Sequence, residues 1–179
     1  MEVMNGRVKL ISNKTMNLLN SLEVKDNKTA LSEVYTELKR NKSVSWSEVE
    51  EMYWYIRKYI SQRNEVGIVQ KAMPIFKYCI EYIVSNDVSA TNGNNIVVDL
   101  MLYLYVKLSD TKLYQQIKDM FVFVVRTCRH IAVIDVVVKK LYKEQNQYVI
   151  INTLNLFCDV LKRIAALEEL SVSQQMLIQ

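Results

Sequence analysis

Residues that interrupt helices are scarce in this chain. Only three glycines and one proline occur in 179 residues, while half of the residues are hydrophobic. Glycine and proline are the residues that most strongly disfavour a helix interior, so their scarcity leaves long segments free to be helical. We therefore expect an all-α protein.

Asparagine, aspartate and serine mark the expected helix boundaries instead. The longest turn-forming segment is 85–95, which is rich in asparagine and is predicted to be a loop between two halves of a single all-helical domain, 1–179. A second break precedes Ser45, which forms with Glu48 the serine-x-x-glutamate pattern of a capping box. Weaker breaks at 25–27, 64–67, 109–110 and 144–147 bring the expected number of helices to about eight.

Consecutive predicted helices pair into three hairpins. These are 45–63 with 65–84, 95–108 with 110–128, and 129–143 with 148–167. The hairpins recur at roughly 35 to 50 residues, which is similar to the period of HEAT and armadillo repeats. The likeness is one of period alone, because no signature residues align between the pairs. We expect stacked helical hairpins in a short HEAT/armadillo-like solenoid, with a compact helical bundle as the alternative.

One segment could be a strand instead of a helix. Six of the eight residues in 131–138 are β-branched, which is typical of a buried strand. The segment continues to Leu141 without a turn signal, and Asp135 is one helical turn from Lys139, so a helix is preferred.

The segment 148–167 carries two apolar stripes about 100° apart, one through Leu154 and Leu161 and the other through Val149 and Leu156. We expect neighbouring helices to cover both stripes.

The residues that usually carry catalysis are few. His130 is the only histidine, and Cys128 lies two positions before it, so their side chains would point in opposite directions on a helix. No glycine-rich phosphate loop occurs, and no cysteines and histidines have the paired spacing of a zinc site. We expect no enzymatic activity, no cofactor and no metal.

The cysteines and the apolar segments indicate a compartment. Cys79, Cys128 and Cys158 are odd in number and widely spaced, which favours free thiols over a disulfide framework. The strongly apolar stretches are broken or too short to span a bilayer, and no secretory signal is recognisable. A cytoplasmic or nuclear protein without a membrane partner is expected.

Two aromatic residues lie off the core-facing side of the helix predicted at 45–63. Trp54 is about 140° from the apolar stripe of that helix, and Tyr55 also points outward. With Glu51 and Lys58 they form the candidate partner-binding site, because aromatic residues are enriched at binding hot spots. In the alternative interpretation, a helix from the first 43 residues covers the aromatic pair as a second core layer.

Three functions are consistent with these patterns. The first is a non-enzymatic interaction module, an α-helical scaffold or adaptor that binds another polypeptide. The second is a viral or cellular bundle of the Bcl-2 type that captures a partner helix in a groove, an analogy without matching motifs. The third is nucleic-acid binding through a set of basic residues: Lys9, Lys14, Arg40, Lys42, Arg57 and Lys58. The net charge is only +4 and acids are interleaved with bases, which disfavours nucleic acid as the partner.

Overall fold

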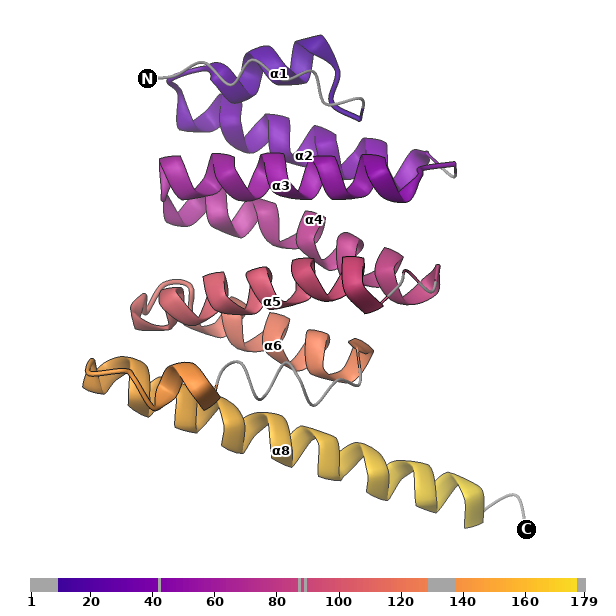
Figure 1. The fold of residues 1–179 in the computed structure, drawn as a ribbon, viewed down its shortest axis with the longest axis vertical. Coiled ribbons are helices and arrows are strands. Elements are labelled where there is room, and N and C mark those ends of the chain that lie inside the picture. The colour runs from indigo at the N-terminus through magenta and orange to yellow at the C-terminus, as the bar shows by residue number, and fades with distance from the viewer. Residues whose placement is uncertain (1–9, 42, 87, 89, 129–137, 177–179) are drawn as a thin grey trace. The chain divides into compact units, whose positions relative to one another are not determined.

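Helices are the regular elements of this protein. The computed structural model describes residues 10–41, 43–86, 88, 90–128 and 138–176, and within these ranges it contains helices and no strand, which confirms the all-α prediction (Figure 1). The α-helices are α1 (Asn13–Asn20), α2 (Val24–Arg40), α3 (Trp46–Arg63), α4 (Val66–Ser85), α5 (Ala90–Val106), α6 (Tyr114–Cys128) and α8 (Gln147–Met176), and a 3₁₀ turn, η1, spans Lys107–Ser109.

The chain forms two compact units. The first is Met1–Ile96 and the second is Val97–Gln179, so the boundary lies within α5. It lies directly after the segment that was predicted to separate two halves of one domain.

Two helical hairpins build the first unit. Helix α1 packs on α2, and α3 packs on α4 (Figure 1). Helices α2 and α4 also pack against each other. The predicted pairing of 45–63 with 65–84 is thus observed. Tyr53 and Phe76 are fully buried, with ring centroids 5.4 Å apart, and the Tyr53 hydroxyl donates to the Ile96 carbonyl at 3.3 Å. These large side chains anchor the core of the unit.

The ends of α3 follow the predicted capping pattern. The Ser45 amide donates to the Glu48 carboxylate at 3.0 Å, which confirms the capping box. The helix ends at Asn64, whose φ of 50° is left-handed and whose amide donates to the Ile60 carbonyl at 2.9 Å. Local sequence signals therefore determine both boundaries of this helix.

Asn27 corrects the predicted break at 25–27. Helix α2 already begins at Val24, and Asn27 is fully buried in its first turns. The Asn27 side-chain amide donates to the carbonyls of Leu18 and Ser21 at 3.0 Å each and to that of Leu19 at 3.3 Å. These carbonyls lie at or just after the C-terminal end of α1, where the last carbonyls of a helix lack the full set of partners inside it. Asn27 thus joins the first two helices.

Helix α5 corrects the predicted loop at 85–95. The helix begins at Ala90 and contains Gly93, so only the segment before residue 90 remains a connection. A Cβ on Gly93 would lie 2.7 Å from Cγ2 of Ile83, closer than real contacts allow. A side chain at this position would force Ile83 to shift, so the glycine suits the close approach of α5 to α4 and serves helix packing and not a turn.

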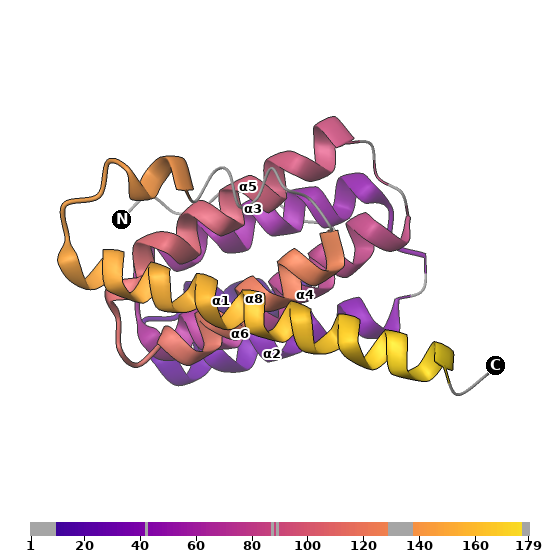
Figure 2. The ribbon, with the colours of Figure 1, turned by 90° about the horizontal axis from the view of Figure 1, so that it is seen from below.

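The second unit contains the larger part of α5 together with η1, α6 and α8. Contacts join η1, α6 and α8 to one another, and Figure 2 shows α8 crossing in front of α6. Val149, Thr153 and Leu156 are the buried face of α8. The Asn152 side chain donates to the Leu108 carbonyl at 2.7 Å, and Lys118 of α6 forms an ion pair with Asp159 of α8. Packing and polar contacts thus fix the first half of α8 on its unit.

The segment 131–138 lies outside the described residues except for Val138, which is helical together with residues 139–141. The predicted hairpin of 129–143 with 148–167 is therefore described only in part. Among the helices of the described ranges, none is both long and apolar enough to cross a membrane.

Candidate functional site

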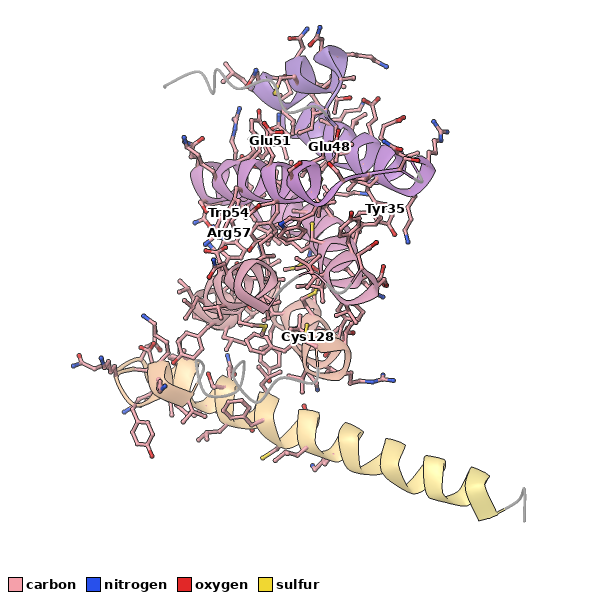
Figure 3. The ribbon with its side chains drawn as sticks, turned by 45° about the vertical axis from the view of Figure 1, so that its right-hand side comes forward. Tyr35, Glu48, Glu51, Trp54, Arg57 and Cys128 are labelled. Atoms are coloured by element: carbon pink, nitrogen blue, oxygen red, sulfur yellow. The ribbon has the colours of Figure 1, made fainter. Side chains whose placement is uncertain are left out.

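The predicted site on α3 is exposed at three of its four residues. Glu51, Trp54 and Lys58 are exposed and have the spacing of one helix face. Trp54, labelled in Figure 3, is 40% exposed. The Trp54 ring meets the ring of Tyr53 edge-on, with centroids 5.0 Å apart. Arg57 lies one turn along and bonds to the Ser61 hydroxyl. We call Glu51, Trp54 and Lys58 the Trp54 surface.

Tyr55 does not belong to that surface. It is 8% exposed, and its hydroxyl donates to Sδ of Met16 on α1 at 2.7 Å. Burial raises its pKa above the usual value for tyrosine. The expectation that Tyr55 points outward is wrong because α1 covers this side of α3, as the alternative interpretation described for an N-terminal helix.

A second candidate site lies in the second unit and was missed by sequence reasoning. It is a pocket of about 550 Å³, lined by Val98, Leu102, Lys139, Lys140, Tyr142 and Lys143. The two aliphatic residues come from α5 and are half-buried, while the three lysines and the tyrosine are exposed. We call it the lysine-rimmed pocket, because its apolar floor lies within a rim of positive charge.

An acidic residue follows the rim of this pocket along the chain. The nearest acid along the chain, Glu144, accepts hydrogen bonds from the amides of Gln145 and Asn146 at 3.0 and 2.9 Å. Oε1 of Glu144 is thereby held in the turn before α8. Tyr142 is 88% exposed, so a large aromatic ring stands at the edge of the pocket beside the lysines.

Helix α8 presents apolar side chains to solvent. Leu154 is 50% exposed and Leu161 is 63% exposed, whereas Val149 and Leu156 are buried. The expectation that neighbouring helices cover both apolar stripes is thus wrong for this part of α8, because the unit packs against one side of the helix only.

The described cysteines are poor nucleophiles where they are buried. Burial raises the pKa of the Cys79 thiol far above its usual range and raises that of Cys128 to about 11, so both thiols stay protonated at neutral pH. Cys158 is exposed, and all three are free. No cluster of three metal-binding side chains occurs in the described ranges. His130 lies outside them.

The exposure of Trp54 predicts a modest role in stability. We expect Trp54→Ala to lower the free energy of unfolding by about 1 kcal/mol, because only part of the ring is buried and its main ring contact is one edge-on pair. Urea denaturation monitored by circular dichroism measures this change. A loss of about 3 kcal/mol or more, typical of a buried aromatic residue, would place Trp54 in the core.

The buried thiol on α6 predicts a loss of stability in alkali. Unfolded Cys128 deprotonates near pH 9, but the folded thiol keeps its proton up to about pH 11. The protonated thiol therefore adds to the free energy of unfolding below pH 9. This contribution, on the order of 2 kcal/mol, is lost as pH rises to about 11. Urea denaturation at several pH values measures the loss. Over this interval the free energy of unfolding of Cys128→Ala should fall by about 2 kcal/mol less than that of the wild type. The same pH dependence in both proteins would contradict the raised pKa of Cys128.

Comparison with known proteins gives no relative on which to base a function. No protein-family model, curated protein or solved structure matches this chain.

Proposed function

We propose that this protein is a non-enzymatic interaction module that binds another polypeptide through the lysine-rimmed pocket. The observation that carries the proposal is the combination of a half-buried aliphatic floor with exposed lysines in one pocket of about 550 Å³. That volume is within the range of roughly 300 to 1,000 Å³ in which ligand-sized groups are held. Free cysteines favour a reducing compartment as its place of action.

The chemistry of the pocket specifies its occupant. Val98 and Leu102 favour an aliphatic or aromatic side chain, whose burial contributes about 25 cal/mol per Å² of apolar surface. Lys140 and Lys143 favour carboxylates beside that anchor. The proposed ligand is therefore an acidic peptide segment with one apolar anchor residue, such as a short amphipathic helix.

The arrangement of the helices supports a scaffold role. In the first unit, the hairpins α1–α2 and α3–α4 contact each other through α2 and α4. We propose that this pairing is the start of a HEAT-like or armadillo-like stack, whose successive hairpins present surfaces to partners. The Trp54 surface is proposed as a second contact in the first unit, and Trp54→Ala should weaken a native complex while the fold remains intact.

Peptide selection on the immobilised full chain tests the function. A random peptide library displayed on phage should yield sequences that combine a leucine, isoleucine or phenylalanine with two or more flanking acids. Leu102→Glu, which places a carboxylate on the pocket floor, should abolish the enrichment. Val106→Glu is the matched control, because Val106 is 68% exposed on the same helix and does not line the pocket.

The selection also separates the proposal from its alternatives. Failure of folded protein to enrich any acidic sequence would contradict the proposed function. Binding of single-stranded nucleic acid through the same lysines would instead show a steep loss of affinity with added salt and no requirement for an apolar anchor.

A further inference from the structure

The exposed side of α8 has the spacing of a helix–helix seam. Gln147, Ile151, Leu154, Cys158 and Leu161 follow one another at alternating steps of four and three residues, and all five are exposed. This is the heptad pattern that keeps one stripe facing a partner helix over successive turns. We call these five residues the α8 seam.

The α8 seam lies opposite the side by which α8 is packed on its own unit. Leu156 is fully buried and occupies the heptad position farthest from the seam, and Val149 and Thr153 are buried with it. The unit therefore holds the back of the helix while the seam faces outward. A second helix can approach the seam without displacing any of the contacts that α8 makes to η1 and α6.

From the seam we infer that two copies of this chain associate through α8 in a parallel pair. Ile151 and Cys158 occupy the a positions, and Leu154 and Leu161 occupy d positions. A β-branched residue at a with leucine at d favours parallel two-stranded pairing. This surface is separate from the lysine-rimmed pocket and does not depend on the proposed function.

Charge explains why a second copy is a suitable occupant. None of the five seam residues is charged, so two identical seams meet without like-charge repulsion at their centre. Lys162 lies beside the seam at an e position, and in a parallel pair it would face the g position occupied by Phe157, which is uncharged. The uncharged seam offers no electrostatic attraction to the acidic peptide proposed for the lysine-rimmed pocket.

The length of the seam sets the kind of association expected. From Gln147 to Leu161 the helix rises about 21 Å, which is two heptads. Such a short seam supports a reversible pair, whose population depends on protein concentration. The two parallel helices bring the Cys158 residues opposite each other at the same a position.

Sedimentation of the full chain over a wide concentration range tests the pair. The weight-average mass should rise from the 21.0 kDa of one chain toward twice that value. Leu154→Lys places like charges at the centre of the seam and should weaken association at least tenfold, which is about 1.4 kcal/mol. Val106→Lys, at an exposed apolar residue outside α8, should leave association unchanged. Circular dichroism verifies that both variants fold.

Cysteine cross-linking of the unaltered chain tests the orientation without relying on a folded variant. Diamide accepts two protons and two electrons from two Cys158 thiols, which become a disulfide. A disulfide-linked pair should form in the native chain and be absent in Cys158→Ser, because Cys79 and Cys128 are buried. A single-chain mass at every concentration would overturn the inference. Association that survives Leu154→Lys, or that gives no Cys158 cross-link, would overturn the parallel α8 pair.

Discussion

Asn27→Asp should lower the free energy of unfolding at neutral pH by about 4 kcal/mol. The wild-type amide donates to three carbonyls at the end of α1 and is fully buried. A carboxylate in this place has no proton to donate, and it brings a buried negative charge against three carbonyl oxygens. Urea denaturation measures the loss.

The pH dependence of Asn27→Asp gives a second readout. Burial and the surrounding carbonyls should raise the pKa of the introduced carboxyl above its unfolded value of about 3.9. The folded state then binds the extra proton, so the variant regains stability as pH falls from neutral toward that value. Asn41→Asp is the control, because Asn41 is exposed and its side-chain oxygen only accepts, from the Ser43 amide at 3.1 Å. A loss below about 1 kcal/mol would contradict the role assigned to Asn27.

Reversing two charges on the lysine-rimmed pocket should weaken binding of the acidic peptide about 100-fold. Lys140→Glu with Lys143→Glu replaces two attractions by two repulsions, and at about 0.7 kcal/mol each these sum to nearly 3 kcal/mol. Isothermal titration calorimetry with a selected peptide measures the change. The effect should shrink with added salt, because the rim is exposed.

A matched pair of lysines separates local contact from net charge. Lys112→Glu with Lys162→Glu changes the total charge by the same amount, and both residues are exposed in the second unit and do not line the pocket. Affinity in this control should fall severalfold at most. Equal losses in both double variants would show that the peptide responds to overall charge and does not occupy the pocket.

Local signals in the sequence predicted the parts of the fold that local interactions determine. Ser45 and Glu48 are three residues apart and form their capping box irrespective of the rest of the chain. The predicted break at 25–27 was wrong because Asn27 bonds to carbonyls six to nine residues away, which turns a turn-former into a buried link. The turn predicted at Gly93 is wrong for the same reason, because the role of this glycine depends on its contact with Ile83 of the preceding helix.

The candidate sites show the same limit. The pattern of α3 placed Trp54 on an exposed face, but whether Tyr55 is covered depends on α1, which lies more than thirty residues earlier. The lysine-rimmed pocket joins Val98 and Leu102 to residues 139–143, and periodicity within one helix does not reveal that proximity. The closely spaced lysines at 139, 140 and 143 were the available signal. Both apolar stripes of α8 were visible, but only the fold shows which one is left uncovered.

Photo-crosslinking tests the central claim, that an acidic peptide binds in the lysine-rimmed pocket, most directly. A selected peptide whose apolar anchor is replaced by photo-leucine is irradiated on the full chain, and mass spectrometry locates the attachment. We predict attachment at Val98, Leu102 or Tyr142, which line the pocket. Attachment to α3 beside Trp54 or to the α8 seam, with none at the pocket residues, would contradict the account.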